Sequence, residues 1–294
     1  MLLLITGSDN RSSDQIVSKL GVDVFRLNFD LWSDYSLSLS PDGWIIYNPS
    51  GFSISSQTVP RAFYWKAFSY PIKCDKLTES EIRYIFRELY SWCALRGIIR
   101  GNSFDYHQNN GKINILSIAK KYFITPSSMV SIGLKNTNDF SSSSVIKSLS
   151  SEVTDDFKAI MTTEVNINDL DPMYPWFLQR KVESKWDITV FICGDKLFSF
   201  RRDRVGLKGL DWRAEQGHGS FQEKEWLFFQ LDEVDSKRVF ELSNDLGINW
   251  GRYDFLLNED KKLVFLEFNA NGQWGFLDPL DENGLLDQVI HYLS

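Results

Sequence analysis

The alternation of apolar and polar positions predicts strands and helices in turn along the first third of the chain. Glycines at 21 and 97 follow the two segments with helical spacing, as is common at helix ends. The strands expected here are 2–6, 22–27 and 61–65, the hairpin is 43–47 with 51–54, and the helices are 13–20 and 79–96. A β-loop-α-β start of this kind predicts a small α/β domain with parallel strands.

The same patterns continue through the rest of the chain, without internal repeats. The serine-rich stretch 139–144 is short and leads directly into an apolar run, so we interpret it as a loop within one lobe. The elements expected here are helices at 113–122, 236–246 and 285–293, strands at 128–132, 145–147 and 176–182, and a hairpin of 187–192 with 196–201.

The segment 251–274 predicts two apolar strands joined by the polar turn 258–261, with polar side chains inside the strands. Glu267 and Asn269 share one face of the second strand, because side chains alternate along a strand. A tight turn near Glu259-Asp260 would place Asp254 opposite Phe265, on that same face and diagonal to Glu267. The side chains expected on the opposite, core-facing side are Phe255, Leu257, Val264, Leu266 and Phe268.

Asp254, Glu267 and Asn269 would together form a group of hard oxygen ligands. Mg²⁺ prefers such ligands and usually sits between protein carboxylates and substrate phosphates. The alternative is an edge hairpin with a solvated polar face. Three oxygen-bearing side chains on one face, flanked by apolar residues, favour the metal site.

Composition limits the classes of function. The 294 residues are 43% hydrophobic, enough for a sizeable core and more than one lobe. A formal net charge of −7 argues against a nucleic-acid partner. The apolar start 1–5 is too short for a signal peptide, and no run approaches the ~18 apolar residues of a membrane helix, so we expect no membrane partner. Three cysteines without metal-ligand spacing favour a reducing cytoplasm.

Basic side chains suggest a site for phosphates. Lys147 ends an apolar strand that runs into a loop of small polar residues, a setting in which an ammonium and backbone amides can hold polyphosphate. A surface lysine that reaches into solvent is the alternative. The run Arg201-Arg-Asp-Arg204 gathers positive charge after the next hairpin, and a solvated basic loop is its competing interpretation.

Taken together, Asp254, Glu267-x-Asn269 and Asn271-Gly272-Gln273-Trp274 resemble the metal-binding end of ATP-grasp ligases. The ending is most similar to the microviridin-type (graspetide) maturases of ribosomally made peptides, and Phe25-Arg-Leu-Asn28 resembles a strand of their N-terminal domain. The resemblance implies an α/β fold: an N-terminal pre-ATP-grasp α/β domain over 1–108, then a two-lobed ATP-grasp module over 109–294, with a central lobe of about 109–182 and a C-terminal lobe of about 183–294.

The resemblance also implies roles for individual residues. Asp187 would reach the ribose hydroxyls or a network of lysines, and Asp211-Trp-Arg213 matches a motif whose arginine faces the γ-phosphate. Gln179 to Val182 resembles the hinge that bonds adenine through its backbone, although Arg180 and Lys181 depart from the family's residues. The implied metal ligands are Asp254, Glu267 and Asn269, the implied ATP contacts are Lys112, Lys147, Gln179, Lys181, Val182 and Asp187, and the implied catalytic residues are Arg213 and Arg202.

The function implied by the resemblance is a carboxylate-amine or carboxylate-alcohol ligase that uses ATP and Mg²⁺. An acylphosphate would form, and a precursor peptide with a leader segment would gain ω-ester or ω-amide cross-links; a homodimer would fit. One alternative is a ligase that adds a free amino acid to a protein or small-molecule carboxylate. Another, of a different class, is a nucleotide-binding module that has lost catalysis.

Overall fold

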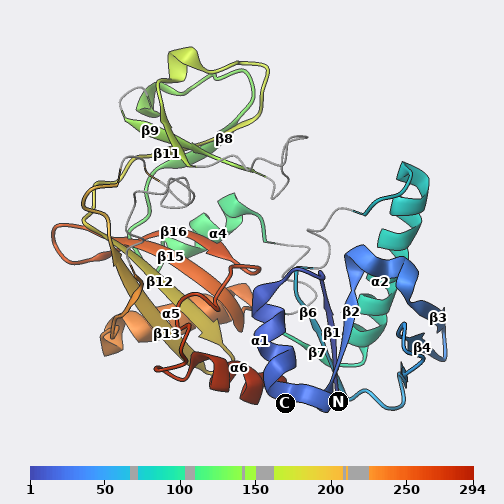
Figure 1. The fold of residues 1–294 in the computed structure, drawn as a ribbon. Helices are drawn as coiled ribbons and strands as arrows, with labels where there is room; N and C mark the ends of the chain where they lie inside the picture. Colours follow the sequence, from blue (N-terminus) through green and yellow to red (C-terminus); the bar gives the residue numbers. More distant parts are fainter. Residues whose placement is uncertain (67–71, 103–109, 141–142, 150–161, 208–209, 211–224) are drawn as a thin grey trace.

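Three larger sheets and a small three-stranded sheet make up the protein in a computed structural model that describes residues 1–66, 72–102, 110–140, 143–149, 162–207, 210 and 225–294 (Figure 1). The first sheet lies in the N-terminal part, the second is formed by strands between residues 128 and 180, and the third by strands between residues 186 and 269. The fold class expected from the sequence, α/β with a distinct N-terminal α/β part, is confirmed.

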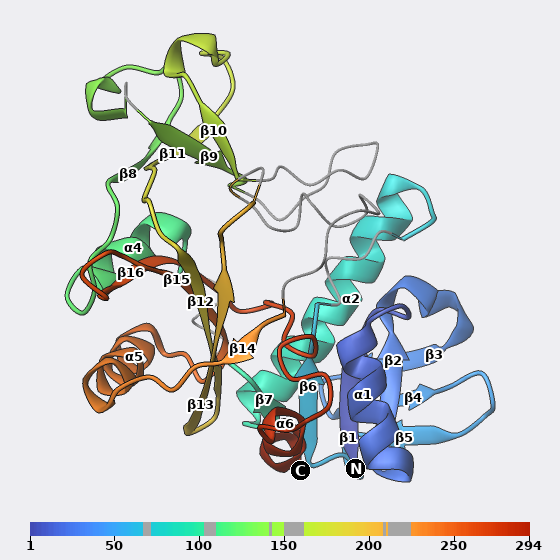
Figure 2. The ribbon, with the colours of Figure 1, turned by 60° about the vertical axis from the view of Figure 1, so that its left-hand side comes forward.

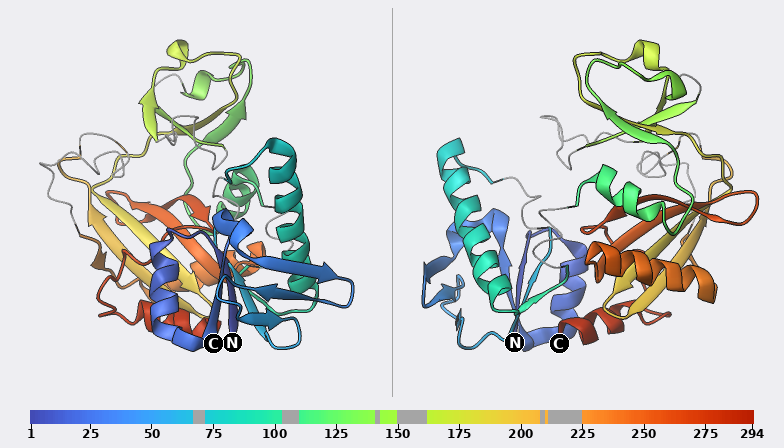
Figure 3. Two further views of the ribbon diagram at one scale, coloured as in Figure 1. Left: turned by 45° about the vertical axis from the view of Figure 1, so that its right-hand side comes forward. Right: turned by 180° about the vertical axis from the view of Figure 1, so that it is seen from behind.

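The N-terminal sheet is parallel, with strand order β2-β1-β6-β7. It lies between two helices, as Figure 3 shows. Leu2 and Leu4 pack on the side of the first helix, and Leu3 and Ile5 on the side of the second, which explains the unbroken apolar run of the first strand. The elements are β1 (Leu2–Thr6), α1 (Arg11–Leu20), β2 (Val24–Asn28), β6 (Arg61–Tyr64), α2 (Lys76–Leu95) and β7 (Ile99–Arg100).

A small antiparallel sheet extends this unit. It contains the expected hairpin of β4 (Gly43–Tyr47) and β5 (Ser53–Ser55), together with β3 (Ser36–Ser40), which the sequence reading missed. The Ser-Leu-Ser-Leu-Ser alternation of β3 is a strand signal in its own right. Short 3₁₀ turns lie at η1 (Gly21–Asp23), η2 (Phe29–Asp34), η4 (Asn138–Phe140) and η5 (Ile167–Asp169).

The second sheet is antiparallel and stands apart from the other two (Figures 1 and 2). Its strand order is β10-β9-β11-β8, and a small cluster of Phe140, Ile167 and Leu178 supports one face. The strands are β8 (Ser128–Ser131), β9 (Ser144–Lys147), β10 (Thr163–Val165) and β11 (Trp176–Arg180).

The third sheet is the structural base of the candidate site. Its antiparallel order is β14-β13-β12-β15-β16. One face packs against α4 and α5, and the other meets α6 and the N-terminal sheet. Helix α4 therefore belongs to this core, although it falls in the range expected for the central lobe. The elements are α4 (Lys112–Ala119), β12 (Trp186–Cys193), β13 (Lys196–Asp203), β14 (Leu227–Phe228), α5 (Glu233–Leu246), β15 (Trp250–Leu257), β16 (Leu263–Asn269) and α6 (Leu285–Leu293).

The N-terminal sheet and the third sheet share one apolar core. Leu4 of β1 and Ile16 of α1 belong to the same cluster as Trp250, Trp274 and Val289. The Ser12 hydroxyl adds a hydrogen bond to Gln273 Oε1 at 2.9 Å. The N-terminal part is thus fixed against the side of the third sheet that carries the candidate site. Within the described ranges, every helix is too short or too polar to cross a bilayer.

The hairpin of β15 and β16 has a register that differs from the expected one. Asp254 lies opposite Glu267 rather than Phe265, because a bulge after Asp254 leaves Leu266 without a partner. Because of the bulge, the side chains of β16 that precede Leu266 point to the opposite side of the sheet from the one expected. Val264 and Leu266 were expected in the core below the sheet, but that core contains Leu263 and Phe265 instead, with Tyr253, Phe255 and Phe268.

Candidate nucleotide and metal site

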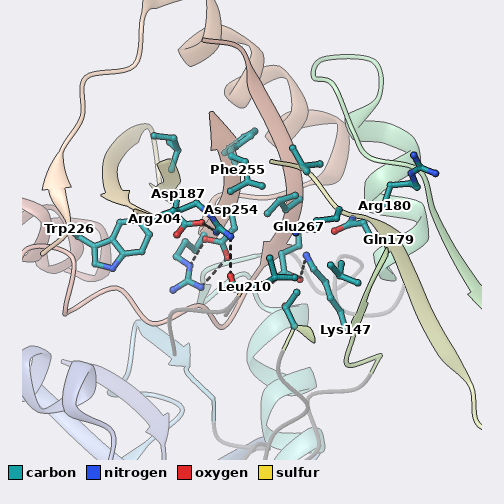
Figure 4. A pocket seen from close by; sticks show the side chains of 18 residues that line it. Lys147, Gln179, Arg180, Asp187, Arg204, Leu210, Trp226, Asp254, Phe255 and Glu267 are labelled. Atoms are coloured by element: carbon teal, nitrogen blue, oxygen red, sulfur yellow. Dashed lines mark hydrogen bonds and ion pairs between the residues drawn. The ribbon is translucent and has the colours of Figure 1, made fainter. Parts of the chain in front are cut away.

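A pocket lies where the second sheet faces the third, and the side chains around it point toward one another in Figure 4. Strands β9 and β11 form one wall, and β12, β15 and β16 form the other. On the face of the third sheet that meets the N-terminal part, one end of β12 and β15 is apolar and packs in the core shared with the N-terminal sheet. The other end of the same face is polar and forms the floor of the pocket. The floor and walls include Val145, Lys147, Gln179, Lys181, Val182, Asp187, Arg204, Arg252, Asp254, Leu256, Leu266 and Glu267.

Asp254 and Glu267 form the centre of the floor. They lie opposite each other in the register of β15 and β16, so both carboxylates project from one face. Arg252, two residues earlier on β15, approaches Asp254 with Nη2 at 3.1 Å from Oδ2 and Nε at 3.0 Å from Oδ1. The buried Thr189 hydroxyl on β12 donates to Asp254 Oδ1 at 2.5 Å. Asp254 is therefore held from two sides.

Two lysines converge on Glu267. Lys112 Nζ at the start of α4 lies 3.4 Å from Glu267 Oε2, and Lys147 Nζ at the end of β9 lies 3.9 Å from the same oxygen. Only 9% of the Lys147 side chain is exposed, against 36% for Lys112, so Lys147 is the better shielded charge. The structure thus brings together two lysines that were expected to contact ATP.

Asn269 shares the face of Glu267, as alternation predicts, but it lies farther along the sheet. Its side chain is exposed, Oδ1 accepts from the Asn271 backbone N–H at 3.0 Å, and the residue lines a second cavity rather than this pocket. Arg252 is its partner across the hairpin. Asn269 is therefore less directly placed than Asp254 and Glu267, which face the lysines.

Asp187 lines the pocket and is bound to an arginine, not to lysines. Its Oδ1 accepts from Arg204 Nη1 at 2.5 Å, while its buried Oδ2 has no hydrogen-bond partner among the described residues. Burial raises the pKa of Asp187 above the usual aspartate range, and the Arg204 charge acts against that rise. A buried acceptor left open beside a pocket is suited to a ligand hydroxyl.

The segment expected to bond adenine lines the same pocket. The Gln179 side chain is buried and donates to Ser128 Oγ at 3.0 Å, which ties β11 to β8. The Lys181 backbone N–H donates to the Ser143 carbonyl at 3.1 Å, so this amide is already used within the second sheet. The Lys181 ammonium pairs with Glu164 and Glu183, which raise its pKa. Val182 follows directly and also lines the pocket.

Of the two arginines expected to act in catalysis, the structure describes one. Arg202 is buried on β13, opposite Asp187 in the register, and lines the second cavity. Arg213 lies outside the described residues, as do Ser150 and Ser151 of the loop after Lys147.

Three residues of the site were not singled out from the sequence. Arg252 precedes Asp254 by two positions and so shares its face, a signal that alternation could have provided. Arg204 lay in the basic run but was passed over in favour of Arg202. Thr189 looked like an ordinary strand residue, and its contact with Asp254 depends on the pairing of β12 with β15.

The donor set fits a magnesium ion that is completed by phosphate oxygens. Mg²⁺ is commonly held by one or two carboxylates together with substrate phosphates, and Asp254 and Glu267 supply two carboxylates on one face. In the described part of the chain, no three His, Cys, Asp or Glu side chains gather into an all-protein cage. The two lysines beside Glu267 supply the positive charge that polyphosphate needs.

Solved structures share this architecture over the whole chain. The macrocyclase MdnC from Microcystis aeruginosa MRC, bound with precursor peptide MdnA, superposes with a TM-score of 0.80 at 19% identity, over 99% of this chain and 98% of that one. A Chryseobacterium gregarium RiPP-associated ATP-grasp ligase, in complex with ADP and a leader and core peptide, gives a TM-score of 0.81 at 21% identity, over 99% and 96%.

A third neighbour is the ATP-grasp ligase PsnB complexed with minimal precursor, Mg and ADP, with a TM-score of 0.68 at 14% identity, over 100% of this chain and 97% of that one. No protein-family model matches the chain, and no curated protein does. The chain therefore has the fold of the ATP-grasp ligases, which confirms the fold expected from the hairpin motif.

Proposed function

We propose that this protein is an ATP- and Mg²⁺-dependent carboxylate-amine or carboxylate-alcohol ligase that installs ω-ester or ω-amide cross-links in a ribosomally made precursor peptide. One observation carries the proposal. Asp254 and Glu267 lie side by side on one face, opposite two lysines, in a pocket between two sheets. Paired carboxylates facing paired ammonium groups are suited to a metal-nucleotide complex, which brings charges of both signs.

Each residue of the pocket has a role under this proposal. Asp254 and Glu267 would hold Mg²⁺, which neutralises charge on the β- and γ-phosphates when it is bound. Lys147 and Lys112 would contact the phosphates, and the open Oδ2 of Asp187 would accept from a ribose hydroxyl. We assign the adenine edge to the backbone of Val182, since the Lys181 amide is used internally. Asn269, Arg202 and Arg213 remain proposed contacts at the phosphate end.

The proposed reaction has two steps. An oxygen of the substrate carboxylate attacks the γ-phosphorus, the bond to the bridging oxygen breaks, and ADP leaves with an acylphosphate formed. A hydroxyl or amine then attacks the acyl carbon and loses its proton, and inorganic phosphate leaves. Lysines and arginines held by fixed partners stabilise the charge on the transferring group without reorganising.

The neighbours support the choice of substrate. MdnC is bound with a precursor peptide, and the Chryseobacterium ligase and PsnB are complexed with peptide and ADP. We propose the same class of partner here, with residues 1–108 as the N-terminal domain, 109–182 as the central lobe and 183–294 as the C-terminal lobe. The free cysteines Cys74, Cys93 and Cys193 suit the cytoplasm. A homodimer is part of the proposal, to be checked by light scattering.

The test is ADP release with and without a candidate precursor peptide encoded beside the gene, followed by mass spectrometry of the peptide. We expect release that depends on a peptide containing Glu or Asp with Thr, Ser or Lys, and loss of the mass of one water for each bond formed. Release driven by free glutamate would indicate an amino-acid ligase instead. Tight ATP binding without turnover would indicate a binding module.

A further inference from the structure

A second cavity, of about 910 Å³, adjoins the nucleotide pocket. Arg252 and Trp226 line both, so the two spaces meet at the phosphate end of the proposed nucleotide site. Among the described residues that line it, Lys66, which lies just after β6, comes from the N-terminal part. The N-terminal domain, which has no role in the chemistry described above, therefore reaches a space next to the reacting groups.

Charged side chains of both signs line this cavity. Lys66, Arg202 and Arg252 are the basic ones, and Glu225, Asp278 and Glu282 are the acidic ones. Arg252 is bound to Asp254, but within the described residues no ion pair joins Lys66 to a carboxylate. Its Nζ lies 5.8 Å from the centre of the Trp65 ring, and burial, with the nearby charge of Arg252, lowers its pKa to about 8. A partly buried ammonium without a counter-charge is costly unless an anion joins it.

The backbone at Lys66 supports the same conclusion. Its φ is 57°, in the left-handed region that residues other than glycine, asparagine and aspartate seldom adopt. The neighbouring Trp65 is fully buried, with its indole N–H bonded to Asn10 Oδ1 at 3.2 Å. The buried Trp65 therefore anchors the backbone from which the Lys66 side chain extends.

Apolar side chains form part of the exposed rim of the cavity, beside polar ones such as Glu225, Asn271 and Glu282. Leu227 and Phe228 on the edge strand β14 are 52% and 48% exposed, and Phe276 and Leu280 on the facing loop are 37% and 77% exposed. Exposed apolar groups around a charged interior fit an acidic side chain that is carried by a chain with apolar neighbours. A free amino acid would leave the rim uncovered.

We propose that Lys66 is a substrate-binding residue supplied by the N-terminal domain, which selects a peptide carboxylate in the second cavity while the apolar rim contacts the flanking side chains. The proposal rests on the proposed function, because it places the carboxylate beside the phosphates that would activate it. Charged groups that share the cavity in the described part of the chain are Arg202, Arg252, Glu225, Asp278 and Glu282.

The test measures binding of two blocked peptides, acetyl-Leu-Phe-Glu-Leu-Phe-amide and the same peptide with Gln, by calorimetry with ADP and Mg²⁺ present. We expect the Lys66→Met variant to bind the Glu peptide about 10- to 100-fold more weakly, with the Gln peptide unaffected, since a charge-assisted hydrogen bond is lost. Lys66→Arg should retain binding of the Glu peptide. Lys73→Met, at an exposed lysine in the same part of the chain, is the matched control.

A pH series adds a second measurement, the affinity for the Glu peptide at each pH. This pH dependence would not be affected if Lys66 had only a structural role. Affinity of the wild type for the Glu peptide should fall as the pH rises through about 8, where Lys66 loses its proton, and Lys66→Arg should remove this dependence. Equal binding of both peptides, no binding of either, or unchanged affinity in Lys66→Met would overturn the proposal. A pH-dependent rate without a change in peptide affinity would instead indicate a proton acceptor, and would also overturn it.

The outcomes separate this inference from the proposed function. If the rate of ATP turnover with a precursor peptide were the same in Lys66→Met as in the wild type, the ligase function would be retained and the role of Lys66 rejected. If binding of the Glu peptide depended on Lys66 in a protein without ATP turnover, the role of Lys66 would be retained and the ligase function rejected. Circular dichroism of each variant checks that the fold is intact.

Discussion

The two adjoining cavities differ in how their charges are balanced. In the proposed nucleotide pocket the basic side chains nearest the floor have carboxylate partners: Lys112 and Lys147 with Glu267, Arg204 with Asp187, and Arg252 with Asp254. In the second cavity Lys66 has no carboxylate partner among the described residues. The first is suited to a ligand that brings a cation and anions together, whereas the second offers one ammonium without a counter-charge to an anionic group of a ligand.

Under the two proposals, one sheet would serve two ligands. Along β15, Arg252 holds the aspartate of the first site and also lines the second. Of the described residues in the N-terminal part, Lys66 lines the second cavity and none lines the first. Changes within the nucleotide pocket should therefore affect turnover or ATP affinity, and changes at Lys66 should affect the peptide.

The largest effect is expected from Glu267→Gln. The change removes a charge that would hold the metal and leaves the side-chain volume almost unchanged, so kcat should fall by about 10³-fold while the fold is retained. Steady-state ADP release and circular dichroism measure the two. Glu259→Gln, in the exposed turn of the same hairpin, is the control and should have no effect. Near-normal turnover in Glu267→Gln would refute the site.

Arg252→Lys should affect both cavities. Lysine keeps the charge but loses the planar fork that contacts both oxygens of Asp254 and the Gln273 carbonyl. We expect kcat to fall by about 100-fold and the KM for peptide to rise in the same variant. A change in only one of the two parameters would contradict a role of Arg252 in both cavities.

Lys147→Ala should weaken ATP binding by about 10- to 100-fold, because a shielded phosphate contact is lost. Lys112→Ala should have a smaller effect, since its side chain is four times as exposed: 36% against 9%. Calorimetric titration with ATP and Mg²⁺ gives both dissociation constants. Lys120→Ala, exposed just after α4, serves as the control. If Lys112→Ala weakened ATP binding more than Lys147→Ala, the inference that the better buried lysine makes the stronger phosphate contact would be wrong.

Much of the fold could be predicted from local pattern. Apolar periodicity and glycine stops predict β1, α1, β2, β4, β5, β6 and α2 of the N-terminal part, the hairpin of β12 and β13, and helix α6, and all of these are present. Strands β3 and β7 were not predicted. Helix α2 begins earlier than expected, at Lys76, because Asp75 caps it by accepting from the backbone N–H groups of Leu77 and Thr78.

The details of the site could be predicted less well. The convergence of Asp254 and Glu267 follows from alternation, but their direct pairing depends on a bulge at Leu266, and nothing in Val-Phe-Leu-Glu marks where one residue is left out of register. Lys66 lies far away in the sequence, and its neighbour Trp65 belongs to the core that the N-terminal sheet shares with the third sheet. Contacts between these two parts depend on how the sheets pack together, which the periodicity of the sequence does not predict.

The smallest effect is expected from Thr189→Val, which tests whether Asp254 must be held from both sides. The substitution keeps the shape of a buried side chain and removes the hydroxyl that donates to Asp254 Oδ1, while Arg252 still binds the carboxylate. A hydrogen bond to a charged group contributes about 1.5–3 kcal/mol, and we expect the lower part of that range because Arg252 remains. Turnover should therefore fall roughly tenfold at saturating peptide, with the KM for peptide unchanged. Thr163→Val, on the exposed strand β10, is the control. If Thr189→Val were as damaging as Arg252→Lys, the hydroxyl rather than the guanidinium would fix Asp254, and the nucleotide pocket would depend on β12 as much as on its own hairpin.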